Sequence, residues 1–346
     1  MAPQQTHRNN FDFLRLLLAS FVIISHSYAL LGLEAMEPLR RLTGSIIFSG
    51  IGVGGFFVLS GFLIYQSVLN SASLAIFVKK RFWRIFPALV TVVLFATFIL
   101  GAVFTQLPLL DYLSQKQTYS YLIKNIFLIP SDNILPGVFR QNHRPEINGS
   151  LWTLRYEVLC YAGMLLYFLI PLKRHKSYTL IAYGFLLAGD LLLTYKPTLL
   201  PDALQYHLSN FFSLTTFFYT GVLLAQWQQV WKPYCKQIFI ASLLLFVGLG
   251  IFKATLIAPI AIWLYPLLIL SFGLMYNPSL QIGKKIGDIS YGTYIYAYPI
   301  QQMLIAIGIQ EVGTLMLLSF ICSWIAGWLS FHLIEKRFLY KQKRIS

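Results

Sequence analysis

Long apolar runs constrain this chain more than any other feature. Only 11% of its residues are charged and 57% are hydrophobic, whereas a soluble domain carries roughly 25% charged residues. A bilayer core of about 30 Å requires about twenty apolar residues per spanning helix. Runs of that length occur at 12–32, 46–69, 84–105, 150–171, 178–195, 208–228, 237–252, 254–276, 288–309 and 313–334. The sequence therefore predicts an all-α integral membrane protein with about ten transmembrane helices.

The segment 237–276 has two possible interpretations in this pattern. Pro259 and Pro266 interrupt it, and proline kinks or ends a helix. The segment therefore predicts either two short spans with a break near Lys253 or one long kinked helix.

Basic residues set the predicted orientation. With the N-terminus inside, about two thirds of the 27 Lys and Arg residues fall at cytoplasmic ends of spans, as membrane proteins prefer. We therefore expect both chain ends in the cytoplasm and the first run to be a retained helix. The net charge of +15 is explained by this bias, so we expect no nucleic-acid partner.

One long extramembrane stretch, 106–149, joins the third and fourth predicted spans. Four prolines occur in it among apolar patches, which favours a packed cap on the outer side over a free linker. We expect one membrane-embedded domain, 1–346, with no appended soluble domain.

Two features that could indicate cofactors lack the required context. The glycine-rich stretch GIGVGGFFVLSGFLI is not preceded by a strand, so Gly50 and Gly54 indicate helix packing and not a dinucleotide site. The cysteines have no metal-ligand spacing, so we expect neither a disulfide framework nor a metal; they are Cys160, Cys235 and Cys322.

Ionisable groups inside the predicted spans carry the functional information, because each is costly in lipid unless it has a partner or a task. Arg15 and His26 are eleven residues apart in the first span, so they share a helix face and differ in depth by roughly 16 Å. A purely structural alternative is a histidine bonded to a backbone carbonyl and an arginine snorkelling to headgroups.

The fourth span contains a second polar group, in NGSLWTLRYEVLCY. Counted from the outer surface, Glu157 and His26 come to similar depths of roughly 10 Å, so the carboxylate could orient or charge the imidazole. The structural alternative is an Arg155–Glu157 pair, but residues two apart point to different helix faces. We expect Asn148, Trp152 and Arg155 of the same group to contact a substrate.

A third group lies at the start of the third span, in KKRFWRIFP. Arg81 and Arg84 are three residues apart on one helix face, beside Lys79 and Lys80, and such a pair suits a phosphate-rich ligand. A positive-inside anchor is the alternative explanation.

These groups together resemble the acyltransferase-3 family of bacterial membrane acyltransferases that O-acetylate surface polysaccharides. The resemblance covers nearly the whole chain in order. It is carried by NNFDFLRLLLASFVIISH, GGFFVLSGFLI, KRFWRIFPAL, NGSLWTLRYEV, GDISYGTYIYAYPIQQ and FHLIEKRF.

The resemblance implies roles for individual residues. His26 matches the histidine proposed as general base and Arg15 its arginine partner. Arg81 and Arg84 match arginines thought to hold the donor phosphates, with Lys80 beside them, and Glu157 matches the family's glutamate. Many members carry a second histidine where this chain has Ala297, which concentrates the base function on His26.

The resemblance thus implies transfer of an acetyl group from acetyl-CoA to a hydroxyl of a cell-envelope or exported glycan, such as an O-antigen or exopolysaccharide, including lipopolysaccharide. It implies a multi-pass protein of the bacterial inner membrane. The alternative is a transporter of a lipid-linked or small carbohydrate, but the sequence lacks the paired broken helices typical of transporters.

Overall fold

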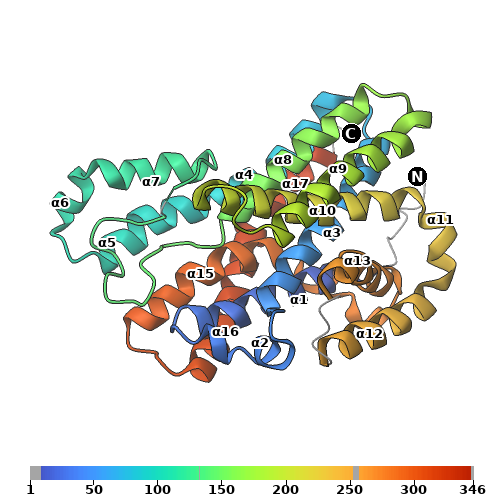
Figure 1. The fold of residues 1–346 in the computed structure, drawn as a ribbon. Helices are drawn as coiled ribbons and strands as arrows, with labels where there is room; N and C mark the ends of the chain where they lie inside the picture. The colour runs from blue at the N-terminus through green and yellow to red at the C-terminus, as the bar shows by residue number, and fades with distance from the viewer. Residues whose placement is uncertain (1–8, 132, 252–256, 344–346) are drawn as a thin grey trace.

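The computed structural model describes residues 9–131, 133–251 and 257–343 (Figure 1). These residues form helices joined by loops and turns, with no named strand and one isolated antiparallel bridge between Thr105 and Val138. Within them, seven helices are long and apolar enough to cross a membrane. They are Phe11–Ala29, Phe48–Leu69, Leu74–Phe104, Leu172–Tyr195, Asp202–Gln226, Gln228–Gly250 and Val312–Leu339. The chain is therefore an all-α, multi-pass membrane protein.

Each of the ten predicted runs overlaps a helix. The helices are α1 Phe11–Ala29, α3 Phe48–Leu69, α4 Leu74–Leu94, α8 Trp152–Leu165, α9 His175–Tyr195, α10 Asp202–Gln226, α12 Cys235–Ile251, α13 Ile257–Leu274, α15 Ser290–Ala306 and α16 Val312–Ser330. The segment 237–276 holds two helices, and α13 continues through Pro266. The expected break near Lys253 lies outside the described residues.

Helix α4 begins well before the predicted start at residue 84. The Ser73 hydroxyl accepts a hydrogen bond from the amide of Ile76 at 3.3 Å, an N-cap that fixes the helix start. The basic cluster therefore lies within the helix and not at its entrance. Beyond Leu94 the helix continues as a π-helical stretch, Phe95–Leu100, and as α5, Gly101–Phe104.

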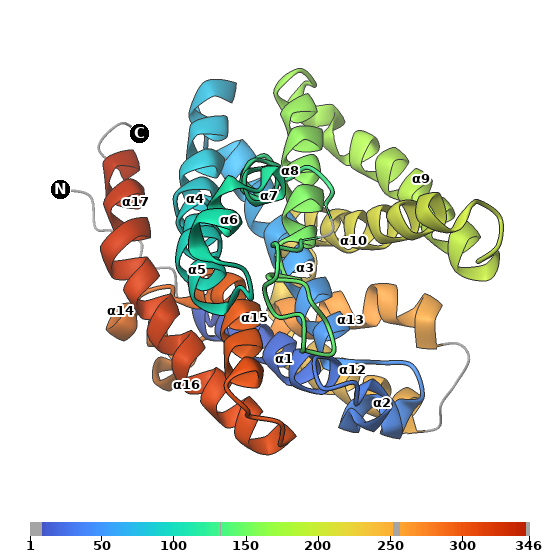
Figure 2. The same ribbon diagram turned by 90° about the vertical axis from the view of Figure 1, so that its left-hand side faces the viewer.

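Part of the segment 106–149 packs against the rest of the protein. It contains α6 (Leu109–Ser114) and α7 (Lys116–Ile126), and α7 packs beside α4 (Figure 2). Tyr112 is fully buried, and its hydroxyl donates to the Thr97 carbonyl at 2.7 Å. The described residues also contain four shorter α-helices: α2 Pro38–Thr43, α11 Gln228–Trp231, α14 Ile282–Ile286 and α17 Lys336–Lys343.

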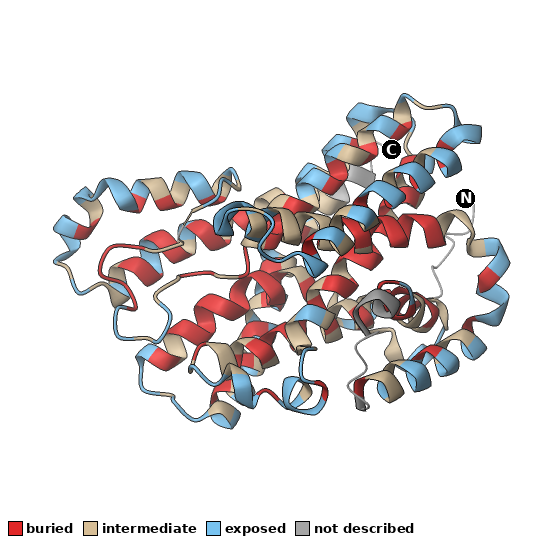
Figure 3. Ribbon diagram, viewed as in Figure 1, coloured by how far each residue is buried: buried red, intermediate tan, exposed pale blue. Residues whose placement is uncertain are grey.

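Helix α15 is buried along most of its length (Figure 3). It packs against α1 and α16. Its Pro299 has no N–H, so the carbonyl of Ile295 one turn earlier lacks its helical partner. The Asn148 side chain donates to that carbonyl at 2.8 Å, and Gln301 donates to the Ile23 carbonyl of α1 at 3.0 Å. Buried polar side chains therefore fix α15 to α1 and to the segment before α8.

Candidate active site

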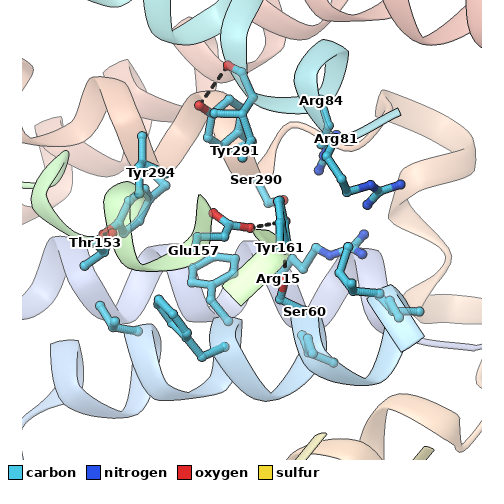
Figure 4. Close-up of a pocket in the computed structure, with 18 residues that line it drawn as sticks. Arg15, Ser60, Arg81, Arg84, Thr153, Glu157, Tyr161, Ser290, Tyr291 and Tyr294 are labelled. Carbon is cyan, nitrogen blue, oxygen red and sulfur yellow. Dashed lines mark hydrogen bonds between the residues drawn. The ribbon is translucent and has the colours of Figure 1, made fainter. Parts of the chain in front are cut away.

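The first cavity lies among α1, α3, α4, α8 and α15 and has a volume of about 120 Å³. Its charged lining residues are Arg15 of α1, Arg81 and Arg84 of α4, and Glu157 of α8. Figure 4 shows the three arginines toward one end, Tyr294 toward the other, and Glu157 between them. We call this the arginine cavity.

Ion pairs join the helices around the arginine cavity. Asp288, which precedes α15, accepts hydrogen bonds from Arg84 at 2.6 Å and from Arg15 at 3.2 Å. Arg15 also pairs with Asp12 at 3.3 Å, and Arg84 lies 3.8 Å from Glu335. The carboxylates thus hold two arginines from different helices in one place.

Glu157 accepts a hydrogen bond from the hydroxyl of Tyr161, one turn later on α8. It lies close enough to all three arginines to attract them. Arg81 has aromatic neighbours, with its guanidinium carbon 5.9 Å from the Phe77 ring centroid and 6.0 Å from that of Tyr161. The predicted common face of Arg81 and Arg84 is confirmed, since both line this cavity.

A second cavity, of about 540 Å³, is lined by His26 of α1, Trp152 and Arg155 of α8, and Tyr298 of α15. The imidazole of His26 meets the Tyr298 ring edge-on, with centroids 5.1 Å apart. Its Nδ1 atom is buried and has no hydrogen-bond partner. We call this the histidine cavity. A buried, unsatisfied nitrogen beside open space is a functional-site signal, because such groups are otherwise costly.

Loop residues form one wall of the histidine cavity. Arg144 lines it and donates to Glu34 at 2.6 Å. This hydrogen bond is the main reason that the pKa of Glu34 lies below its ordinary value, and it raises the pKa of Arg144. Glu146 lines the same wall, and one of its carboxylate oxygens is buried without a hydrogen-bond partner.

Two tyrosines of α15 line different cavities. Tyr294 lines the arginine cavity, and Tyr298, one turn later, lines the histidine cavity. The Tyr294 hydroxyl lies 2.8 Å from that of Thr153 and donates to the Ser150 carbonyl at 3.1 Å. These hydrogen bonds join α15 to the start of α8 and to the residues just before it.

The structure brings the predicted site residues together in two sets and not in one. Arg15, Arg81, Arg84 and Glu157 share the arginine cavity. His26 lies in the histidine cavity with Trp152 and Arg155, two of the residues predicted to bind substrate. The expected proximity of Glu157 to His26 is not observed. Counting helical rise gives depth alone, whereas the side of α8 that faces each neighbour depends on tertiary packing. The alternative Arg155–Glu157 pair is also not formed, since the two side chains line different cavities.

Two other predicted contacts lie elsewhere. Asn148 is completely buried, and its carboxamide oxygen accepts a hydrogen bond from the Ser150 amide at 3.1 Å. This bond and the one to the Ile295 carbonyl are structural. Lys80 is half-buried on α4 and lines neither cavity.

Several residues of these cavities were not predicted from the sequence. Asp288 is the most important, since it holds two arginines, and Tyr161 and Tyr298 are the partners of Glu157 and His26. The available signal was the aspartate in GDISYGT: an acidic side chain at the start of an apolar run needs a basic partner. Tyrosines offered no signal, because aromatic residues are common throughout the chain.

Among the described residues, no three His, Cys, Asp or Glu side chains gather where they could hold a metal ion. Three cysteines are free thiols: Cys160, Cys235 and Cys322.

Comparisons with known proteins agree with the polar pattern. A family model described as an acyltransferase domain matches residues 8–331. An O-acetyl transferase of Shigella phage Sf6 is 30% identical, over 96% of this chain and 97% of that protein. Nodulation protein 10 of Rhizobium leguminosarum bv. viciae is 35% identical, over 45% of this chain and 42% of its own length. No solved structure matches. The chain therefore belongs to the acyltransferase-3 family, and it is an acyltransferase.

Proposed function

We propose that the protein transfers an acetyl group from cytoplasmic acetyl-CoA to a hydroxyl of a cell-envelope or exported glycan, such as an O-antigen or exopolysaccharide. The observation that carries this proposal is His26, whose buried Nδ1 has no partner and whose ring lines an open cavity. The full-length likeness to an enzyme named as an O-acetyl transferase supports acetyl as the transferred group.

The proposed topology has ten spans, with both ends in the cytoplasm and 106–149 as an outer cap. The whole chain, 1–346, forms one membrane-embedded domain in the inner membrane of a bacterium. A helix at each predicted span supports this count, and so does the excess of basic residues in the inner loops.

In this topology the arginine cavity opens toward the cytoplasm, where acetyl-CoA is made. We propose that the donor phosphates bind in this cavity, where Arg81, Arg84 and Arg15, with Lys80 nearby, make the surroundings positive. Guanidinium groups suit this task because their planar N–H groups bind phosphate oxygens in pairs. The acetyl end of the donor then extends past Tyr294 toward the histidine cavity.

The acceptor enters the histidine cavity from the outer side, where Trp152 and Arg155 bind the sugar. Asn148 contributes by positioning the segment that leads into Trp152. An aromatic ring beside hydrogen-bonding side chains gives a sugar both an apolar face and polar partners.

His26 acts as the general base in this scheme. It removes the proton of the acceptor hydroxyl, whose oxygen then bonds to the thioester carbonyl carbon. The carbon–sulfur bond breaks, and the proton passes from His26 to the departing coenzyme A thiolate. We assign Glu157 to the donor side, where it holds Tyr161 and faces the arginines.

Sealed membrane vesicles that contain bacterial envelope glycans test this proposal. Radiolabelled acetyl-CoA is supplied on the cytoplasmic face, and label in glycan is measured for the wild type, His26→Ala and the control His332→Ala. His332 lies in the chain end that follows α16 and lines neither cavity. We expect His26→Ala to lower transfer at least about 100-fold, because general-base catalysis is lost, and His332→Ala to leave it unchanged. Equal transfer by His26→Ala and the wild type would refute the role of His26.

A further inference from the structure

The three arginines of the arginine cavity differ in how their charge is balanced. Arg84 has two carboxylates nearby, Asp288 at 2.6 Å and Glu335 at 3.8 Å. Arg15 has Asp288 at 3.2 Å and Asp12 at 3.3 Å.

Arg81 differs from both. It forms none of the ion pairs found in the described part of the chain. Its close neighbours are the rings of Phe77 and Tyr161, and its Nε is buried without a hydrogen-bond partner. Glu157 attracts Arg81, but it also attracts the other two arginines and accepts its hydrogen bond from Tyr161.

The carboxylate at the centre of this arrangement, Asp288, is itself fixed. One of its oxygens accepts from both arginines, and the other accepts from the Ser290 hydroxyl at 2.5 Å. Glu335 lies in a π-helical turn with its side chain 2% exposed, and it accepts from the Ser330 hydroxyl at 2.9 Å. Irregular turns of this kind often occur at functional sites.

An incoming phosphate meets different costs at Arg84 and Arg81. To bind Arg84 closely it must displace Asp288, which leaves a buried carboxylate without its partner, and that is strongly unfavourable. At Arg81 it displaces no paired carboxylate and satisfies a buried N–H that is now unpaired.

We propose that Arg81 is the residue that contacts the donor anion, and that Asp288 is a positioning residue that keeps Arg84 and Arg15 from binding it. This inference rests on the proposed function for the identity of the donor, and it assigns unequal roles to two arginines of the same helix face. Asp288 thereby leaves only the Arg81 guanidinium open to the phosphate, so the donor binds in a single position.

Binding of coenzyme A to the purified full-length protein in lipid nanodiscs tests the division of roles. Arg81→Gln and Arg84→Gln are matched variants, because each removes one positive charge from the same cavity. We expect Arg81→Gln to weaken coenzyme A binding at least about tenfold, the value of one charge-assisted hydrogen bond. Arg84→Gln should lower the melting temperature, while its folded fraction binds coenzyme A within about threefold of the wild type.

Asp288→Asn tests the positioning role by separating binding from turnover. The change frees two guanidiniums to attract the anion, so coenzyme A should bind as tightly as before or more tightly. Acetyl transfer per folded molecule in the vesicle assay should fall at least about tenfold, because the donor is held in the wrong place. A merely structural role would lower the folded fraction and leave turnover per folded molecule unchanged.

Equal weakening by Arg81→Gln and Arg84→Gln would overturn the inference, as would weaker coenzyme A binding by folded Asp288→Asn. If Asp288→Asn does not fold, coenzyme A binding by Arg81→Gln and Arg84→Gln decides whether the inference holds. Inorganic pyrophosphate serves as a second probe. Arg81-dependent binding of pyrophosphate without binding of coenzyme A would refute the proposed donor and keep the inference, and binding of neither probe would refute both.

Discussion

Asn148 has a different role in the structure from the one predicted from the sequence. Its place beside Trp152 suggested contact with a substrate, yet its side chain is fully buried and bonded to the Ile295 carbonyl. That carbonyl needs a donor because Pro299 cannot supply one. The sequence contains both residues, but their pairing across 147 positions is set by the packing of α15 beside α8.

We predict that Asn148→Ala lowers stability by about 1–3 kcal/mol, because it leaves a buried carbonyl unsatisfied. Thermal unfolding in detergent measures the loss. The double variant Asn148→Ala with Pro299→Ala should recover part of it, since alanine at 299 restores the helical N–H. A double variant that is no more stable than Asn148→Ala would show that the carbonyl is not the cause.

Glu157 illustrates a second limit at the residue scale. Counting residues along α8 estimated its depth, but depth does not specify the neighbour that it faces. Tyr161, one turn later, and the arginines of α1 and α4 form its surroundings. None of these contacts follows from spacing within α8 alone.

At the scale of elements, glycines decide how closely helices cross. A Cβ at Gly61 of α3 would lie 1.9 Å from the Phe218 carbonyl oxygen, and one at Gly221 of α10 would lie 2.2 Å from the Val58 carbonyl oxygen. The sequence pattern correctly indicated glycine-mediated packing in this stretch, but it singled out Gly50 and Gly54. A Cβ at Gly50 would meet only Ile47, at 3.4 Å.

We therefore predict opposite effects for two alanine substitutions in α3. Gly61→Ala should cost about 1–3 kcal/mol or more, because the backbone of α10 must move to admit the methyl group. Gly50→Ala should be neutral or stabilising, since it reduces the freedom of the unfolded chain without a clash. Melting temperatures of the two variants provide the comparison, and equal losses would contradict the proposed crossing contact.

At the scale of the whole molecule, the number of membrane crossings determines which side each cavity faces. Seven helices in the described chain satisfy the length and hydropathy required of a span, whereas the apolar pattern predicts ten. Helices α8, α13 and α15 are the three predicted spans that are not among these seven. If all ten span, Val230 of α11 is cytoplasmic; if only the seven span, it is on the outer side.

Single cysteines introduced at two exposed positions test the topology. Leu110 and Val230 are 81% and 68% exposed, and both are placed in a background that lacks the three native cysteines. A membrane-impermeant thiol reagent should label Leu110→Cys in intact cells and Val230→Cys only after the membrane is opened. Labelling of Val230→Cys in intact cells would refute the ten-span proposal.

The sequence by itself determined the class of protein, because apolar runs of membrane length and a scarcity of charge leave few alternatives to a helical membrane fold. It also singled out His26, Arg81 and Arg84 as candidate site residues, since ionisable side chains stand out against apolar helices. Only the tertiary structure decided which of these residues meet. The separation of His26 from Glu157, and the capture of Arg15 and Arg84 by Asp288, depend on how α1, α4, α8 and α15 pack. Helix spacing fixes the positions of side chains along one helix, whereas contacts between distant segments arise when several helices bury their polar groups together.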